Sequence, residues 1–392
     1  MFSCRLPASV TPSPLAAAMA AQRQAGRIRV DFTLSNPTAA GFSYPETLAT
    51  AWSNAANLDY TPESLGTASA RDAVAGAYEP ALTVAADRIV LTASTSEGYA
   101  FLFKLLCNAG DRVMAPAPSY PLLDHLATLD AVGLDRYALH DAGHWTIDFA
   151  DLEARLTPRT RALVVVAPNN PTGSVPTPAE WTTLLDLCAR HRLTLIVDEV
   201  FAPYRFDGSP GEAGVWMPAD SPALTVRLNG LSKLVGLPQA KLAWMIVDGP
   251  ASLVREAIDR LEVIADTYLS VSTPVQVALP TLLAEGRFVR DQIRSRLVRN
   301  LDALARSAAC RDAASLRRPQ GGWTAVLRTP GAGAEAEGLV RALLHEGVLA
   351  HPAFFYDFAH DGYLVVSLLT PPDQFDTGLD ALSEVLAAGT TS

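Results

Sequence analysis

The feature that most restricts the fold of this chain is the alternation of short apolar runs with helical patterns between residues 88 and 248. The runs are rich in valine, leucine and isoleucine, so a strand made from one of them has both faces covered, and the helices in between supply that cover. The pattern therefore predicts an α/β fold with a mainly parallel sheet. The predicted strands are 88–92, 112–115, 162–167, 193–197, 224–228 and 243–247, with helices at 96–108, 119–131 and 178–191.

The pattern changes beyond residue 250. Helices are followed there by shorter apolar strands, which is typical of a second, smaller α+β domain. The stretch 273–309 carries six arginines, and the first five, at 287, 290, 294, 296 and 299, have helical spacing; we interpret the stretch as one long helix with a solvated basic face. The predicted segments are helix 252–265, helix 273–309, strand 321–328, helix 335–346 and strand 362–369.

Charge and composition exclude several classes of function. The net charge of −10 repels nucleic acid and anionic lipid, so we expect neither as a partner. The four cysteines are far apart and no histidines have ligand spacing, so we expect no disulfide framework and no metal site.

The chain has no run of 18 apolar residues, so we expect no membrane helix. Near the N-terminus, several prolines favour a helix over 14–24 with Ser13 as its N-cap, rather than a signal peptide. A cytoplasmic protein is the expectation.

Four polar features follow predicted strands, where ligands of α/β folds bind. Ser94, Thr95 and Ser96 open a helix and could cradle an anion, although an ordinary helix cap is an alternative. The others are the Asn169-Asn170-Pro171-Thr172-Gly173 turn, Asp198 and Lys233. An acidic side chain at the end of a buried apolar strand requires a charged or hydrogen-bonding partner, unless it lies in an exposed loop. A lysine that is removed from water can act as a nucleophile.

Together these features resemble the class I/II aminotransferases of the fold-type I superfamily, which use pyridoxal 5′-phosphate. The likeness runs from about Asp31 to Leu369 and is most specific at 169–173, 198–200 and Ser232-Lys233. It implies a large domain with a mixed, mostly parallel seven-stranded sheet and a small α+β domain from both termini. The expected division is an N-terminal arm with part of the small domain at 1–45, the cofactor domain at 46–270 and the small domain at 271–392. The resemblance also implies a homodimer that shares its active sites.

The resemblance implies a role for each motif residue. Lys233 would form the Schiff base with the cofactor and serve as general base. Asp198 would pair with the ring nitrogen, Asn170 would bond the 3-oxygen, and Tyr120 would stack on the ring; these four are the expected catalytic residues. Phe201 would also contact the cofactor.

Further residues would bind the phosphate or the substrate. The expected phosphate-side residues are Ser94, Thr95, Ser96, Ser232 and Lys241, together with Tyr60 reaching the neighbouring subunit. Asn36 and His351 would join Asn170 on the substrate side, although a structural histidine is an equal alternative for His351.

The sequence departs from the family pattern at four positions. Phe201 replaces a tyrosine and cannot donate to the 3-oxygen, Gly230 replaces a serine or threonine, and Lys241 replaces an arginine. Val365 stands where the family has the arginine that binds the substrate carboxylate, so either other groups hold the carboxylate or the substrate differs. Asn170 and backbone N–H groups near Asn36 are the candidates to hold the carboxylate. Arg205 and Arg328 are weaker candidates, since arginines in such positions are more often surface charges. Tyr204 could also face the site.

The implied activity is transfer of an amino group from an amino acid or amine to an oxo acid. The same cofactor chemistry also serves a carbon–sulfur or β-eliminating lyase or a decarboxylase. Because the arginine that binds the substrate carboxylate is missing, these alternatives have more weight here than in a chain that keeps it. A ligand-sensing module fused to a DNA-binding domain is another hypothesis, which the acidic net charge disfavours. A scaffold protein without cofactor is a third, which the presence of Lys233, Asp198 and Asn170 disfavours.

Overall fold

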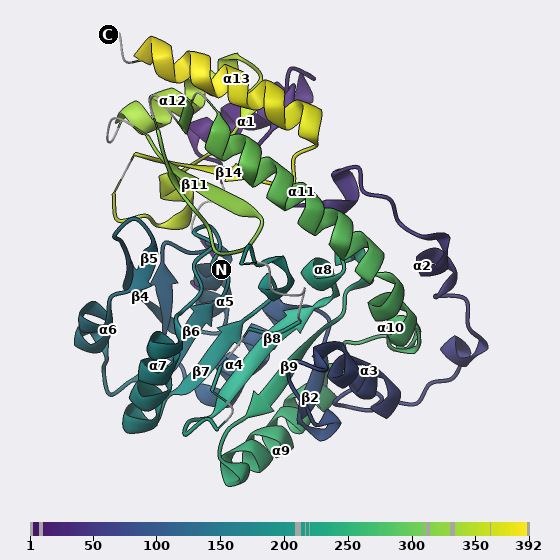
Figure 1. Ribbon diagram of the computed structural model, residues 1–392. Helices are drawn as coiled ribbons and strands as arrows, with labels where there is room; N and C mark the ends of the chain where they lie inside the picture. The colour runs from purple at the N-terminus through teal and green to yellow at the C-terminus, as the bar shows by residue number, and fades with distance from the viewer. Residues whose placement is uncertain are drawn as a thin grey trace.

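The alternating pattern produces one eight-stranded sheet in the order β2-β9-β8-β7-β6-β3-β4-β5 (Figure 1). This computed structural model describes residues 3–7, 11–207, 213–215, 217–218, 220–307, 309–310, 314–329, 334–360 and 362–389. β3, β4, β6, β7 and β8 run parallel, whereas β2, β9 and β5 pair antiparallel with their neighbours. The strands are β2 Ile89–Thr92, β3 Arg112–Ala117, β4 Gly133–Asp141, β5 Trp145–Ile147, β6 Thr160–Val166, β7 Thr194–Asp198, β8 Thr225–Gly230 and β9 Ala243–Asp248.

The expected count of seven strands was wrong by one. β5 forms a hairpin with β4 and adds an eighth strand at the edge of the sheet. The apolar runs did not indicate β4 either, because it is only partly buried and carries Asp135, Arg136 and His140. A strand next to the edge that is only partly buried lacks the continuous apolar run that marks a central strand.

Both faces of the central strands are buried, as predicted. Along β6, Ala162, Val164 and Val166 belong to one apolar cluster, and the alternating residues Leu163 and Val165 belong to another. The helices of this part of the chain are α3 Ala68–Tyr78, α4 Thr95–Leu106, α5 Leu122–Leu129, α6 Phe149–Arg155, α7 Pro178–His191, α8 Leu231–Leu234 and α9 Ala251–Tyr268. α7 has the predicted bounds because Thr177 and Glu180 form a capping box at its start.

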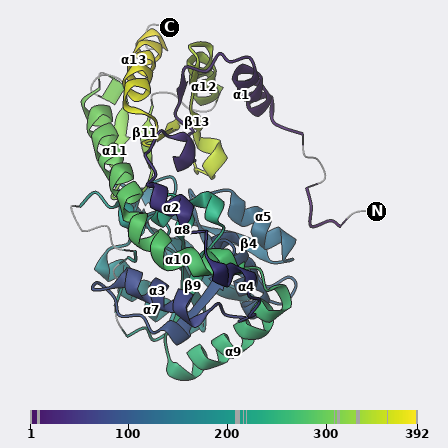
Figure 2. The ribbon, with the colours of Figure 1, turned by 90° about the vertical axis from the view of Figure 1, so that its right-hand side faces the viewer.

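A smaller unit built from both ends of the chain adjoins the large sheet (Figures 1 and 2). β1 (Val30–Asp31) pairs in parallel with β12 (Val348–Leu349), which joins the N-terminal segment to the C-terminal part. A separate antiparallel sheet has the order β10-β11-β14-β13. The remaining elements are α1 Pro14–Gln24, α2 Glu46–Thr50, β10 Ser315–Arg317, β11 Thr324–Arg328, α12 Ala334–His345, β13 His351–Pro352, β14 Tyr363–Ser367 and α13 Pro372–Gly389.

The N-terminal helix is confirmed: α1 begins at Pro14, and the Ser13 hydroxyl accepts a hydrogen bond from the amide of Ala16. The long basic helix is not. It divides at Gly286 into α10 (Thr273–Glu285) and α11 (Arg287–Arg306). A Cβ on Gly286 would lie 2.4 Å from the Leu282 carbonyl oxygen and 2.5 Å from Val235, so the close approach requires glycine.

The basic face of α11 is only partly solvated. Arg296 donates to the carbonyl oxygens of Ala40 and Leu369 at 3.1 Å each, and Arg299 pairs with Asp376 of α13. These arginines therefore tie the helix to both terminal segments. The domain boundaries at residues 45 and 270 stay a prediction.

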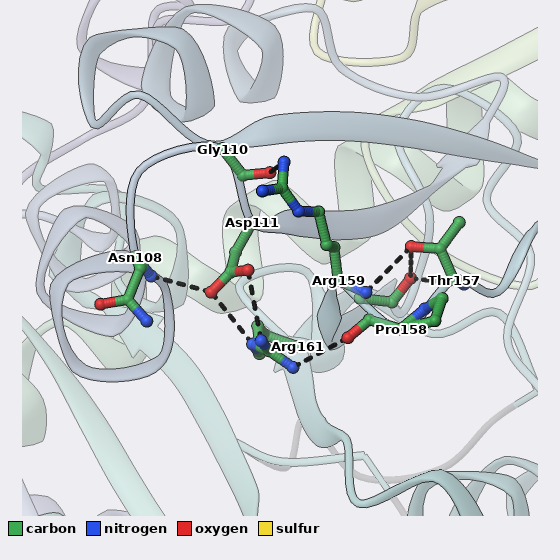
Figure 3. Close-up of polar contacts among 8 residues, drawn as sticks. Asn108, Gly110, Asp111, Thr157, Pro158, Arg159 and Arg161 are labelled. Atoms are coloured by element: carbon green, nitrogen blue, oxygen red, sulfur yellow. Dashed lines mark hydrogen bonds and ion pairs between the residues drawn. The ribbon is translucent and has the colours of Figure 1, made fainter.

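A polar cluster lies at the end of the sheet where β3 and β6 begin (Figure 3). The Asp111 carboxylate accepts from the Asn108 amide and from Arg161 Nε, both at 3.0 Å, and Arg161 Nη1 donates to the Pro158 carbonyl. The Asn108 amide and Arg161 lower the pKa of Asp111. This cluster joins the starts of two strands. It lies at the opposite end of the sheet from the predicted site residues, which are found at the carboxyl ends of the strands.

Candidate active site

A cleft of about 480 Å³ opens beyond the carboxyl ends of β6, β7 and β8 and is closed on its other side by β11 and β14 of the smaller unit. Its volume is typical of a small-molecule site. The structure brings most of the predicted site residues together around it. Those that line the cleft are Ser94, Thr95, Ser96, Tyr120, Asn170, Asp198, Phe201, Ser232, Lys233, Lys241 and His351.

Lys233 enters the cleft from α8, which directly follows β8. Its Nζ lies 3.5 Å from the Ser35 carbonyl oxygen and 4.6 Å from the centre of the Trp323 ring. Burial lowers the pKa of Lys233 to about 8, and nearby Asp198 opposes that shift. The Tyr204 hydroxyl donates to the Lys233 carbonyl at 2.6 Å, so it fixes the lysine backbone.

Asp198 ends β7 and faces the same cleft. The Tyr99 hydroxyl donates to its Oδ2 at 3.0 Å, and the Val200 amide donates to its Oδ1 at 3.3 Å. Burial raises the pKa of Asp198 to about 6, although both hydrogen bonds oppose the rise. Sequence reasoning missed Tyr99 because it sits among the apolar positions of α4.

The start of α4 combines a helix cap with two hydroxyl side chains that line the cleft. The Ser94 hydroxyl accepts from the Glu97 amide at 3.1 Å, and the Glu97 carboxylate accepts from the Ala93 amide at 2.7 Å. The Ser94 side chain is therefore used as a cap. Thr95 and Ser96, in the first turn, line the cleft with it, and so does the exposed Lys241. A helix start with a nearby cation suits an anion.

The polar turn after β6 contains an amide oxygen that has no partner among the described residues. Asn170 Oδ1 is buried and unpartnered, whereas Asn169 Oδ1 accepts from Thr172 Oγ1 at 2.9 Å. A buried polar atom of this kind costs free energy unless a ligand or water satisfies it. Because Asn170 lines the cleft, its orphaned oxygen points to a polar ligand there.

Two of the predicted residues do not line the cleft. Tyr60 is 77% exposed and borders a separate surface hollow with Leu269. The Asn36 side chain accepts from the Thr38 amide at 3.0 Å and caps a short 3-10 helix at Pro37–Ala39, while its neighbour Ser35 lines the cleft.

The structure explains why residue 230 is glycine, and it shows the surroundings of Val365, the other departure from the family pattern. A Cβ on Gly230 would lie 2.7 Å from Ala243 Cβ and 3.1 Å from the Leu242 carbonyl oxygen, so the strand pairing leaves no room for serine. Val365 is buried in the cleft wall, and its strand partners are Val326 on one side and His351 on the other.

The other arginine candidates lie elsewhere. Arg205 pairs with Asp207, and Arg328 is exposed at the end of β11 and does not line the cleft.

The sequence matches the family of class I and II aminotransferases over residues 48–382. The chain belongs to this family. It is 30% identical over 253 residues to the glutamate-pyruvate aminotransferase AlaA of Escherichia coli, covering 64% of this chain and 62% of that protein. It is 31% identical over 268 residues to an alanine aminotransferase of Mycobacterium tuberculosis, covering 66% of this chain and 61% of the relative. The matched segment thus spans about three fifths of these relatives.

Solved structures show the aminotransferase fold along almost the whole chain. An alanine aminotransferase from Pyrococcus furiosus superposes with a TM-score of 0.87 at 21% identity and covers 99% of this chain and 100% of its own. An aspartate aminotransferase mutant from Thermus thermophilus gives 0.83 at 23% identity, with 98% and 100% coverage. The fold is therefore that of the fold-type I aminotransferases.

Within the described residues, no helix is long and apolar enough to cross a bilayer. That same part of the chain contains no cluster of three or more histidine, cysteine or acidic side chains suited to a metal ion.

The surroundings of Lys233 lead to a test of its reactivity. The chain has only three lysines, at 104, 233 and 241. With a pKa of about 8, half of the Lys233 amines are neutral at pH 8, compared with roughly 0.4% for an unperturbed lysine. We expect reductive methylation of the apoprotein, followed by peptide mass spectrometry between pH 6 and 10, to modify Lys233 with an apparent pKa of about 8. A Lys233 profile with its midpoint near 10.4, the value of an ordinary lysine, would contradict the shift.

Proposed function

We propose that this chain is a pyridoxal 5′-phosphate-dependent aminotransferase that moves an amino group from an amino acid or amine to an oxo acceptor. The observation that carries the proposal is that the Lys233 amine and the Asp198 carboxylate line one cleft. Burial there lowers the pKa of Lys233 to about 8 and raises that of Asp198 to about 6. The named activities of AlaA and the alanine aminotransferase support transfer over elimination or decarboxylation.

The residues of the cleft fit this cofactor. Lys233 would hold its aldehyde carbon, Asp198 would pair with its ring nitrogen, and Tyr120 would cover its ring face. Asn170 would donate from its side-chain Nδ2 to the 3-oxygen, and its unpartnered Oδ1 is left to accept from another polar group in the cleft. Phe201 adds apolar surface to the same wall without a donor. The phosphate-side residues would be Thr95, Ser96, Ser232 and Lys241, with Ser94 capping the helix beneath them.

The side chains divide the chemistry between charge stabilisation and proton transfer. When bound, the cofactor supplies an electron sink for negative charge at the substrate α-carbon. Asp198, held by Tyr99 and the Val200 amide, would keep the ring nitrogen protonated. The Lys233 amine, once free, would take the proton from the substrate α-carbon and deliver it from the same face to the aldehyde carbon of the cofactor. Phe201 and Trp323 shield this amine from water.

We further propose a cytoplasmic homodimer with shared sites. Leu58 and Tyr60 are 90% and 77% exposed on one segment, and Tyr268 is also largely exposed. A second copy that covers these side chains would remove apolar surface from water and could bring its Tyr60 to the phosphate of this chain. We propose 46–270 as the cofactor domain, and 1–45 with 271–392 as the small domain.

The cofactor assignment can be tested covalently. Borohydride reduction of the protein reconstituted with pyridoxal 5′-phosphate should trap the cofactor on one peptide that contains Lys233. Because the other two lysines are at 104 and 241, peptide mass spectrometry separates all possible sites. Unlabelled protein, or label at Lys104 or Lys241, would refute the proposal.

The position of Tyr99 gives a further prediction. Its hydroxyl lowers the pKa of Asp198, so Y99F should raise that pKa further. We expect kcat/KM to fall about 10-fold or more, as for a lost hydrogen bond to a charged group, and its acidic limb to move to higher pH. Y137F is a matched control because Tyr137 donates to the Val164 carbonyl and does not line the cleft. An acidic limb that is unchanged in Y99F would contradict the positioning role.

A further inference from the structure

The charge content of the cleft limits which substrates it can hold. Among the described residues that line it, the only cationic side chains are Lys233 and Lys241, and the only acid is Asp198. Lys233 and Lys241 are both assigned to the cofactor in the proposed function. No described cation in this chain's share of the cleft is therefore left for a substrate carboxylate, and an unpaired carboxylate is costly to bury.

The wall around Val365 is apolar and aromatic. Val365 is 1% exposed and packs in a cluster with Trp145, Val326, Tyr356 and Tyr363. A charged group placed against this wall would lose its hydration and gain no partner from it. Ser367, the next residue on the same face of β14, already donates its hydroxyl to the Leu34 carbonyl at 2.5 Å.

One polar pair remains on this wall. His351 is the strand partner of Val365, and its Nδ1 lies 3.1 Å from the Tyr356 hydroxyl; both residues line the cleft. Burial lowers the pKa of His351 to about 4 and raises the pKa of Tyr356, so both groups are neutral at pH 7. Asp31 and Arg23, which act on His351 with opposite signs, are themselves an ion pair at 2.9 Å.

A neutral histidine and tyrosine that share one hydrogen bond still have a donor and an acceptor to offer. If the tyrosine donates to Nδ1, the imidazole Nε2–H remains free; in the other tautomer the tyrosine O–H remains free. Either arrangement can bond a hydroxyl or a carbonyl group. Neither supplies the positive charge that a carboxylate needs.

We propose that the His351–Tyr356 pair recognises a neutral hydroxyl or carbonyl group next to the reacting amine, so that the cleft prefers amino alcohols or amino amides to α-amino carboxylates. This inference rests on the proposed aminotransferase function and names its substrate class. The amine end would lie towards Lys233, and the neutral polar group would lie against the wall formed by Val365, His351 and Tyr356.

The test compares matched amines in single turnovers of the reconstituted protein, followed by the loss of the visible aldehyde band. L-Alaninol and L-alaninamide should react at least about tenfold faster than L-alanine at equal concentration, since the carboxylate lacks a partner. A faster reaction of L-alanine would overturn this inference and leave the proposed function standing. Protein without a visible band and without label at Lys233 would instead overturn the proposed function.

Variants separate recognition from packing. Y356F keeps the aromatic ring against Val365 but removes the hydroxyl. We expect it to slow the reaction of L-alaninol by roughly tenfold, mainly through a higher half-saturation concentration. The reaction of isopropylamine, which has no polar group besides its amine, should keep its rate. V365R should shift the preference towards L-alanine. Equal losses for L-alaninol and isopropylamine in Y356F would overturn the recognition role, and the unfolding midpoint of each variant checks that the fold is retained.

Discussion

Replacement of Lys233 by alanine should lower kcat/KM for amino transfer by about four orders of magnitude. Lys233 supplies the buried amine of the cleft, whereas the other lysine that lines it, Lys241, is exposed. Loss of both covalent attachment and proton transfer removes two contributions at once. Single-turnover measurements with the reconstituted variant would give the value.

Two further variants define what this loss means. K233R keeps a positive charge but cannot supply a neutral amine at pH 8, so we expect it to be as inactive as K233A. K104A removes a lysine that pairs with Asp130 on the surface, and its activity should equal that of the wild type. More than a tenth of the wild-type rate in K233A would contradict the assignment.

K233A should lose activity without losing stability against unfolding. The folded protein holds the pKa of Lys233 below its ordinary value of 10.5, so the charged lysine opposes folding at pH values below about 8. That cost disappears as the pH rises above 10.5, where the amine is neutral in both states. K233A should therefore unfold at the same temperature as the wild type, or a higher one, when both are measured without cofactor at pH 7.

The strand ends were predictable because they are local. An apolar β-branched run followed by a polar residue places that residue at the carboxyl edge of the sheet, and this pattern located Asn170, Asp198 and Lys233 in one cleft. The capping signals at Ser13 and Thr177 are equally local, and α1 and α7 have the predicted bounds.

The contacts that tune the site were not predictable in this way. Tyr99 has the spacing of a core residue of α4, and only the pairing of the strands brings its hydroxyl to Asp198. His351 was identified, but its partnership with Tyr356 depends on the turn between β13 and β14. The break at Gly286 depends on contact with Val235, about fifty residues earlier in the chain.

A buried ionic network lies directly behind Asp198. The next residue, Glu199, is fully buried, and its carboxylate accepts from Arg227 Nη1 at 2.9 Å, from the Val215 amide at 3.1 Å and from the Tyr78 hydroxyl at 2.9 Å. Trp244 Nε1 donates in turn to the Tyr78 hydroxyl at 3.1 Å. The network thereby joins β7, β8, β9 and the end of α3 underneath the cleft.

Removal of one partner from this network should be far more damaging than removal of both. R227M leaves Glu199 as a buried charge without its cation, and we expect it to lower the free energy of unfolding by about 3–5 kcal/mol. The double variant E199Q/R227M has no buried charge and should recover a large part of that loss. Urea unfolding of the apoproteins at pH 7 measures both values.

The surface pair Arg260–Glu256 provides the matched control, because its side chains are 65% and 58% exposed on α9. R260M should change the free energy of unfolding by less than about 0.5 kcal/mol, since exposed i,i+4 pairs contribute little. A cost below about 1 kcal/mol for R227M would mean that water or backbone rearrangement satisfies Glu199. In that case only the hydrogen bonds from Tyr99 and Val200 would position Asp198 at the cleft. The buried network would not contribute by holding the end of the strand rigid.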